Sequence, residues 1–339
     1  MSDNNRQWIF LKRPQGTLTE DIFELRQTAI EKPKDGKILV RTALVSLDPA
    51  NRAWMEPTPT YKEPVMPGDV MHGFAIGRVV ESSAEGFQPG DVVEGMLGWQ
   101  EYATVPAATV RKRNPRHSME NLLGVLGITG LTAYYGLLEV AKIAAGETVV
   151  ISAAAGAVGT ITGQIAKLKG CRVIGIAGGP EKCAWITEGL GFDVAVDYKS
   201  ADFKADLAKA VGEGVDVYFD NVGGDIFEAI IPHLKTYARV VACGTLTDYN
   251  DAEPQPGPRG LQIACVVKRL RIEGFIVLDY MATWDKAEEE LAGWIEAGSL
   301  KPPVDVREGF ETLPANLIGL FKGTNRGKLM VRIAPVQSA

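Results

Sequence analysis

The sequence predicts a two-domain α/β protein: a small, largely antiparallel β domain, then a doubly wound domain built on a parallel sheet. Two observations support this prediction. Before residue 123, short apolar runs broken by Pro and Gly follow one another closely, at 37–49, 73–82, 89–97 and 100–106. From residue 123 onwards, continuous apolar runs alternate with helical stretches, which is typical of a parallel sheet covered on both faces.

The elements of the second domain follow in regular order. Strand-like runs lie at 148–153, 172–178, 194–198, 215–220, 239–244 and 272–277, and helical stretches at 156–169, 181–190, 201–212 and 224–235. The tail returns to a short strand at 327–335. We therefore expect one domain at 1–122, completed by 301–339, and a second domain at 123–300.

Composition excludes several classes of partner. A net charge of −6 and a pI near 5.3 argue against nucleic acid or an anionic membrane as the main partner. The uncharged run 148–166 contains Ser, Thr, Gln and glycines, and it divides naturally into strand, turn and helix, so we predict no transmembrane segment. The first residues carry no basic stretch followed by an apolar run, so we do not expect export. Four scattered cysteines without a CxxC pair favour a reduced, cytoplasmic setting.

The turn after the first strand of the second domain reads AAGAVG and matches a dinucleotide fingerprint. Its candidate binding residues are Ala154 (at the first glycine position), Gly156, Ala157, Val158 and Gly159. Gly156 lets a pyrophosphate approach the helix N-terminus, where N–H groups and the helix dipole favour an anion. Gly159 lets the helix lie close to the sheet. The alternative is a tight packing corner that holds no ligand.

The helix after this turn is predicted to bury one stripe of side chains, made of Val158, Ile161, Ile165 and Leu168.

The end of the second strand favours NADP(H) over NAD(H). A site for NAD usually has Asp or Glu here, bonded to the ribose 2′-hydroxyl. This chain has Gly178, which leaves space for a 2′-phosphate, and Lys182, which supplies positive charge. Glu181 does not fit the pattern, although in a first helical turn it can cap the helix or face solvent. The alternative is that Lys182 is only a solvated helix charge.

No metal site is predicted. Catalytic zinc needs three protein ligands, but residues 1–170 contain no cysteine, and His72, His117 and His233 stand apart. Direct reduction of a simple ketone is then less favoured than hydride addition to a double bond conjugated with a carbonyl. The developing enolate needs only hydrogen-bond donors, and a tyrosine can provide one.

Many segments resemble the zinc-independent medium-chain dehydrogenase/reductases, in the branch of leukotriene B4 dehydrogenase/prostaglandin reductases and 2-alkenal (curcumin-type) reductases. The resemblance covers nearly the whole chain. It rests on LVSLDPANRAWM (44–55), GWQEYATV (98–105), GITGLTAYYGL (127–137), AAGAVG with GQIAKLKGC (163–171), YFDNVGG (218–224), CGTLTDYN (243–250), RLRIEGFIVLDY (269–280) and FKGTNRGKLMV (321–331). It implies a GroES-like β domain and a Rossmann domain, and an NADPH-dependent homodimeric reductase of α,β-unsaturated aldehydes and ketones.

The resemblance also implies roles for individual residues. Lys182 and Tyr198 would contact the 2′-phosphate, and Asn325 would contact the cofactor. Asn221, at the end of a parallel strand, lies where such folds place ligands. Tyr249 would lie beside cofactor and substrate and donate a hydrogen bond to the enolate, together with the nicotinamide ribose hydroxyl.

Some interpretations stay open at this point. Tyr198 could be an ordinary strand-end tyrosine, and the Pro- and Gly-rich stretch 251–260 after Tyr249 could be a connector or a lid. Ala50 and Asn51 stand where the family commonly has Tyr-Met, which leaves substrate preference open. The alternatives to an enal reductase are a quinone oxidoreductase of the same superfamily and a non-catalytic dinucleotide-binding protein.

Overall fold

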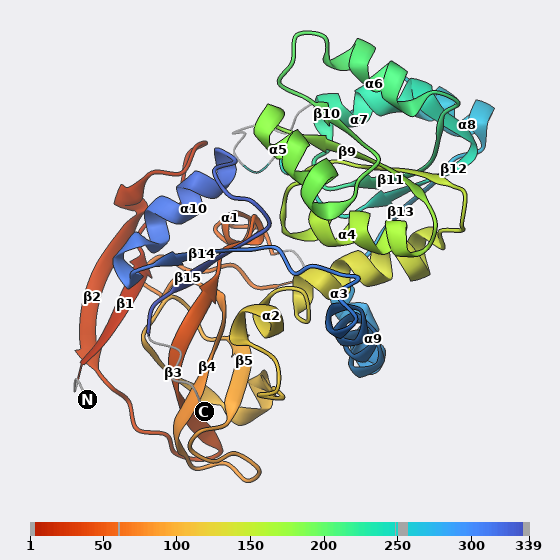
Figure 1. The fold of residues 1–339 in the computed structure, drawn as a ribbon. Coiled ribbons are helices and arrows are strands. Elements are labelled where there is room, and N and C mark those ends of the chain that lie inside the picture. The colour runs from red at the N-terminus through yellow and green to blue at the C-terminus, as the bar shows by residue number, and fades with distance from the viewer. Residues whose placement is uncertain (1–3, 60–61, 248, 250–256, 335–339) are drawn as a thin grey trace. The chain divides into compact units, whose positions relative to one another are not determined.

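The computed structural model describes residues 4–59, 62–247, 249 and 257–334. The chain forms two compact units, one made of Met1–Leu123 with Val304–Ala339 and the other of Gly124–Pro303 (Figure 1). No helix in the described residues is long and apolar enough to cross a membrane.

The first unit is built on a seven-stranded sheet in the order β14-β15-β3-β4-β5-β7, with β6 also paired to β3. A separate ribbon pairs β1 with β2. The strands are β1 (Asn4–Phe10), β2 (Phe23–Ala29), β3 (Lys37–Ser46), β4 (Phe74–Ser82), β5 (Val92–Met96), β6 (Tyr102–Pro106), β7 (Val110–Lys112), β14 (Val304–Glu308) and β15 (Lys328–Arg332). The helices are α1 (Ala50–Ala53), α2 (Met119–Leu123) and α10 (Leu313–Phe321).

The tail of the chain supplies part of this unit's core. Strand β15 pairs antiparallel with β3 and parallel with β14. The core includes Phe10, Trp99 and Phe310, from the beginning, the middle and the tail of the chain. Trp99 is fully buried and stacks on Phe23, with ring centroids 5.2 Å apart. Burial of these large apolar side chains holds the distant segments together.

The second unit contains a six-stranded sheet in the order β10-β9-β8-β11-β12-β13, in which every pair is parallel. Its strands are β8 (Thr148–Ile151), β9 (Arg172–Ala177), β10 (Val194–Asp197), β11 (Val215–Asp220), β12 (Leu234–Ala242) and β13 (Arg271–Gly274). The order reverses between β8 and β11. The predicted doubly wound α/β fold is confirmed.

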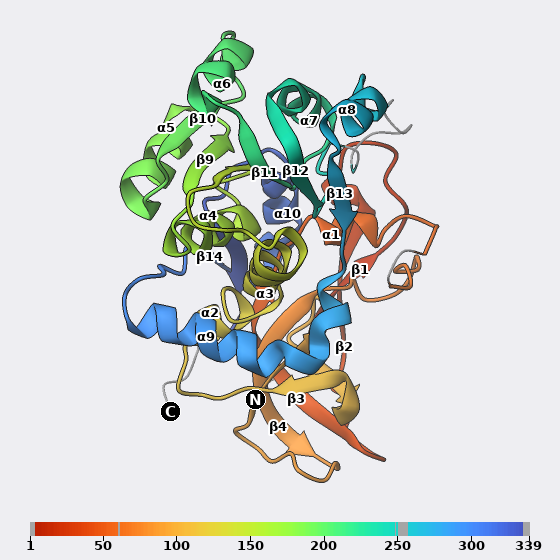
Figure 2. The same ribbon diagram turned by 90° about the vertical axis from the view of Figure 1, so that its right-hand side faces the viewer.

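Helices cover both faces of this sheet, as Figures 1 and 2 show, with α6, α7 and α8 on one face and α3 and α4 on the other. Helix α9 packs on α3. The helices are α3 (Ile128–Tyr135), α4 (Ala157–Leu168), α5 (Pro180–Ala184), α6 (Phe203–Val211), α7 (Gly224–Ile230), α8 (Leu261–Lys268) and α9 (Trp284–Glu296).

The predicted buried stripe of α4 is only partly present. Ile161 and Ile165 are buried, but Leu168 is 39% exposed and Val158 is partly exposed. The prediction was wrong for Leu168, because this residue is the last of the helix and its side chain remains partly in solvent.

One glycine in the middle of α4 allows close packing and carries a stability prediction. A Cβ on Gly163 would lie 1.9 Å from Cζ of Phe192. We expect Gly163→Ala to lower the free energy of unfolding by about 1–3 kcal/mol, because a filled site cannot take an extra methyl group without displacing its neighbours.

Gly293 in α9 is the matched control, because no atom lies within 4 Å of a Cβ built there. Gly293→Ala is expected to raise the free energy of unfolding by about 0.5–1 kcal/mol through helix propensity alone. Urea unfolding of both variants makes the comparison. Equal stability of the two would mean that Phe192 moves aside without cost.

Candidate functional site

The turn between β8 and α4 ends at a helix N-terminus that no side chain among the described residues caps. The N–H of Gly156 donates to the carbonyl of Ala153 at 2.8 Å, and a Cβ on Gly156 would lie 3.1 Å from that oxygen. Ala154 is buried and donates its N–H to the carbonyl of Ile176 on β9 at 2.9 Å. The turn is thus tied to the neighbouring strand, and the helix that begins at Ala157 presents the end of its dipole that favours an anion.

Gly159 determines how closely α4 approaches this turn. A Cβ on Gly159 would lie 2.4 Å from the carbonyl oxygen of Ala153, so no other residue fits here without moving the backbone. Ala153 has a φ of +48°, an unusual value for a residue with a side chain. The turn therefore combines a left-handed residue and a close helix contact, which is the packing role predicted for Gly159.

The next loop, after β9, brings Gly178 and Tyr198 together. A Cβ on Gly178 would lie 2.8 Å from the Tyr198 ring and 3.1 Å from Cε of Lys199. The Asp197 carboxylate accepts the N–H groups of Gly179 and Lys199 at 2.8 and 2.9 Å, which closes the loop. Tyr198 is 44% exposed. The small size of Gly178 thus makes room for a tyrosine ring at the edge of the candidate site.

Two lysines, Lys182 and Lys199, follow Gly178 and Tyr198 closely in the sequence. Lys182 lies in the short helix α5, partly buried, while Glu181 beside it is exposed. The ammonium of Lys199 lies 5.9 Å from the centre of the Tyr198 ring. Sequence reasoning missed Lys199, although its position directly after Tyr198 in DYK was a usable signal. An exposed tyrosine with a lysine ammonium over its ring suits a phosphate group.

Asn221 joins the ends of two strands. Its Nδ2 donates to the carbonyl of Ser152 at 2.8 Å, and its backbone N–H donates to Ser152 Oγ at 2.8 Å. Ser152 directly follows β8 and Asn221 directly follows β11, so the pair lies where the strand order reverses. In doubly wound sheets, ligands bind at this point.

The segment that leads to Tyr249 runs along the turn after β11. The N–H of Leu246 donates to the carbonyl of Asn221 at 3.3 Å, and the N–H and Oγ1 of Thr247 donate to the carbonyl of Val222 at 3.2 and 2.8 Å. Tyr249 itself is partly buried. Of the predicted connector or lid at 251–260, residues 251–256 lie outside the described residues, as do 248 and 250.

Asn325 belongs to the other unit. It is 6% exposed and lies just before β15, where its Nδ2 donates to the carbonyl of Gly327 at 2.9 Å. This bond closes the turn into the strand. The amide nitrogen of Asn325 therefore has a structural role within its own unit.

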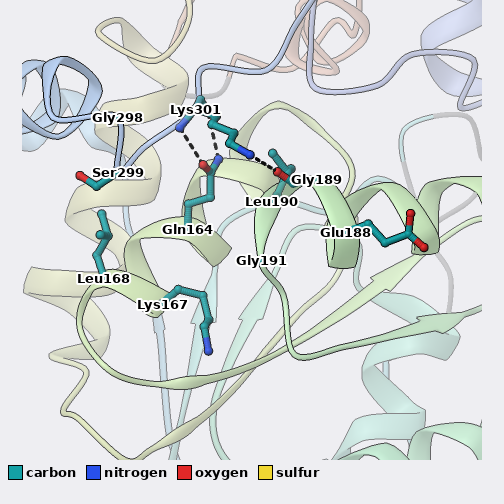
Figure 3. Close-up of a pocket in the computed structure, with 10 residues that line it drawn as sticks. All are labelled: Gln164, Lys167, Leu168, Glu188, Gly189, Leu190, Gly191, Gly298, Ser299 and Lys301. Atoms are coloured by element: carbon teal, nitrogen blue, oxygen red, sulfur yellow. Dashed lines mark hydrogen bonds between the residues drawn. The ribbon is translucent and has the colours of Figure 1, made fainter.

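A cavity of about 380 Å³, drawn in Figure 3, is lined in part by Gln164, Lys167 and Leu168 from the C-terminal half of α4. The Gln164 side chain bonds the backbone of Lys301 twice, at 3.0 and 2.8 Å, and Lys301 Nζ donates to the carbonyl of Gly189 at 2.8 Å. Gln164, Lys301 and Gly189 of the lining thus bond one another, and none of the predicted site residues lines the cavity. We do not assign the candidate site to it.

His72, one of the histidines considered as a metal ligand, has an altered acidity. Burial, together with the charge of Lys62, lowers the pKa of His72 to about 4 against the opposing charge of Asp69. Between about pH 4 and the ordinary value near 6.5, the unfolded chain therefore binds a proton that the folded protein does not bind.

This difference predicts that the free energy of unfolding falls as the pH drops from about 6.5 to about 4, because protons favour the unfolded state there. His72→Gln should make the dependence shallower. Urea unfolding of wild type and variant at several pH values in this window tests the expectation, and parallel curves would assign the titration to another group.

Comparison with known proteins matches both units. The family model described as "N-terminal domain of oxidoreductase" matches residues 6–112, and the one described as "Zinc-binding dehydrogenase" matches residues 157–293. The chain is 42% identical to the NADPH-dependent curcumin reductase of Escherichia coli, over 97% of each chain. It is 37% identical to the NADP(+)-dependent 2-alkenal reductase of Nicotiana tabacum, over 98% of each. The crystal structure of CurA from Vibrio vulnificus in complex with NADPH is 39% identical, with a TM-score of 0.93 and coverage of 97% and 99%.

The zinc in the second family description has no matching ligand set in the part of the chain that the structure describes. No group of three or more His, Cys, Asp or Glu residues there is arranged to hold a metal ion. Cys171, Cys183, Cys243 and Cys265 are all free, and burial raises the pKa of Cys243 to about 12. These residues do not fit zinc.

Proposed function

This chain belongs to the medium-chain dehydrogenase/reductase family, in the branch of curcumin, prostaglandin and 2-alkenal reductases, and we propose that it reduces the carbon–carbon double bond of α,β-unsaturated aldehydes and ketones with NADPH. The observation that carries the proposal is the pair of loops after β8 and β9. The first ends in an uncapped helix behind Gly156, and the second has Gly178 where a site for NAD would carry a carboxylate.

The residues present fit NADP(H). The end of α4 and the backbone of Ala154, Gly156, Ala157, Val158 and Gly159 would hold the pyrophosphate, since Gly156 carries no side chain that would keep an anion away. Lys182 and Tyr198 would hold the 2′-phosphate beside Gly178, with Lys199 as a further cation. Asn221 and Asn325 would be further cofactor-binding residues. Bound NADPH supplies a hydride to the β-carbon of the substrate.

The protein's own part in the reaction is to stabilise the charge that develops on the substrate carbonyl. Tyr249 would donate its phenolic O–H to that oxygen as the enolate forms. Protonation at the α-carbon, by solvent, then gives the saturated aldehyde or ketone. The balance is one hydride to the β-carbon and one proton to the α-carbon, with no metal involved.

We further propose the arrangement in which this reaction takes place. Residues 1–122 with 301–339 would form the GroES-like substrate domain, and 123–300 the NADP(H)-binding domain. The protein would be cytoplasmic. A homodimer would form through β13, the last strand of its sheet, whose four residues are all exposed and include Ile272 at 38%. Sedimentation of the purified protein tests the dimer.

The function is tested by following nicotinamide absorbance with a panel of 2-alkenals, enones and quinones, using NADPH and NADH in parallel. A saturated carbonyl product, identified by mass and NMR and formed chiefly with NADPH, is expected. An allylic alcohol would overturn the enolate mechanism. Turnover of quinones alone would favour a quinone oxidoreductase, and tight NADPH binding without turnover would leave a binding protein.

A further inference from the structure

A buried acidic side chain at the end of β11 has no role in the mechanism above. Asp220 is only 4% exposed, and one of its carboxylate oxygens, Oδ1, accepts four hydrogen bonds. The donors are the Tyr218 hydroxyl at 2.8 Å, Ser152 Oγ at 3.0 Å, and the N–H groups of Val222 and Gly223 at 3.0 Å each. A carboxylate is the side chain best suited to accept from so many donors at once.

Two of the donors come from side chains whose hydroxyls keep their protons. Burial raises the pKa of Tyr218 well above its ordinary value, with the charge of Asp220 adding to the effect. The Ser152 hydroxyl has one hydrogen, which it donates to Asp220, while it accepts the N–H of Asn221. Asn221, Ser152 and Asp220 therefore form a chain of hydrogen bonds in which each bond polarises the next.

The orientation of Asn221 depends on this chain. Its side-chain Nδ2 donates to the carbonyl of Ser152, the same residue that holds its backbone N–H. Because Asp220 accepts from Ser152 and from the two N–H groups after Asn221, it determines the shape of the turn on which Asn221 sits. Asp220 itself faces the protein interior.

The same residue also supports the segment that leads to Tyr249. The backbone carbonyl of Asp220 accepts the N–H groups of Cys243 and Gly244 at 2.8 and 3.1 Å. Thr247, two residues before Tyr249, bonds the carbonyl of Val222. Residues 243–247 are thus hydrogen-bonded along the turn that the Asp220 carboxylate holds.

We propose that Asp220 is a positioning residue for the double-bond reduction, acting through Ser152, Tyr218 and its own turn to hold both Asn221 and the segment before Tyr249. The inference rests on the proposed function. Loss of the carboxylate charge should loosen both Asn221 and the segment that leads to Tyr249, since the Asp220 turn bonds to each. A displacement of a fraction of an ångström at a reacting centre is enough to reduce a rate, whereas binding of the distant 2′-phosphate end changes little.

Asp220→Asn is the first variant, because it keeps the size of the side chain and removes its charge. We expect kcat for a 2-alkenal to fall about tenfold or more, while KM for the alkenal and Kd for NADPH, titrated by fluorescence without substrate, change less than about threefold. The fluorescence of bound NADPH itself should change, because the nicotinamide is less confined. A residue that only stabilised the fold would lower the melting temperature and leave kcat per folded molecule unchanged.

The matched control is Asp216→Asn, at the other end of the same strand. Asp216 accepts the N–H of Thr148 at 2.9 Å and pairs with Lys235 at 2.8 Å, so the same change there removes comparable bonds far along β11. This variant should lose stability and keep wild-type kcat. A similar fall of kcat in both variants would overturn the inference.

Tyr218→Phe keeps the inference testable if Asp220→Asn does not fold. It removes one of the four donors without changing size, and kcat should fall about two- to fivefold at unchanged KM. In the Asp220→Asn background, the same change should have no further effect, as expected for residues that act through one network. If the wild-type protein reduces the alkenal and both variants keep its kcat, the inference is overturned and the proposed function stands. Absence of alkenal turnover in the wild type overturns the proposed function, and the inference with it.

Discussion

Tyr249→Phe is expected to lower kcat for a 2-alkenal about 100-fold while the protein stays folded and still binds NADPH. The expectation follows from the cost of removing one preorganised donor from a developing oxyanion, which is about 10²–10³ in kcat. We choose the lower value because the nicotinamide ribose hydroxyl would remain as a second donor. Stopped-flow absorbance with saturating alkenal and NADPH measures the effect directly.

Tyr237→Phe is the control for this prediction. Tyr237 lies on β12 in the same unit and is 68% exposed, so it loses the same hydroxyl at a surface position. Wild-type kcat is expected for it. If Tyr249→Phe also keeps wild-type kcat, the enolate is stabilised by another donor, and the role proposed for Tyr249 is wrong.

The central strands of the second unit were predictable because burial on both faces leaves a strong signal. Val149, Val150 and Ile151 on β8, and Val173 and Ile174 on β9, are fully buried, and such runs of apolar residues are read directly from the sequence. Each predicted strand begins or ends within a few residues of the observed one. The edge of the sheet was less clear, since β13 has only four exposed residues and the run 272–277 extends beyond it.

Elements whose residues show no clear apolar pattern were missed or given the wrong bounds. The predicted helix 224–235 runs past the end of α7 at Ile230 and into β12, which begins at Leu234. Pro232 marks the change, but the apolar residues around it fit either structure. The β1–β2 ribbon was not predicted, because its second strand is exposed at every position after Phe23 and has no alternating pattern.

Some parts of the candidate site could be predicted from the sequence and others could not. The glycine turn is local, because the residues from Ala154 to Gly159 lie within one strand–turn–helix unit and spacing alone identifies them. The contact of Gly178 with Tyr198 and the bonds of Asp220 to Ser152 connect residues 20 and 68 positions apart in the chain. Such pairs depend on which strands are neighbours in the sheet, and no local pattern reveals that order.

Lys182→Ala carries the second large expected effect, on the choice of cofactor. A charged hydrogen bond contributes about 1.5–3 kcal/mol, so we expect KM for NADPH to rise about 10- to 100-fold at unchanged kcat. KM for NADH should stay the same, because NADH has no 2′-phosphate for Lys182 to contact. Steady-state kinetics with both cofactors gives the ratio. Substituting Gly178 would be a poorer test, since any side chain there collides with Tyr198.

Lys209→Ala, in the last turn of α6, is the control for net charge, because it removes an exposed lysine from the same unit. It should leave the ratio of the two KM values unchanged. If KM for NADPH rises only about twofold in Lys182→Ala, the contact with the 2′-phosphate is assigned to Lys199 instead. Lys199→Ala would then show the larger rise in KM. Equal KM changes for NADPH and NADH in Lys182→Ala would contradict a 2′-phosphate site altogether, since a loss common to both cofactors cannot arise from the one group that distinguishes them.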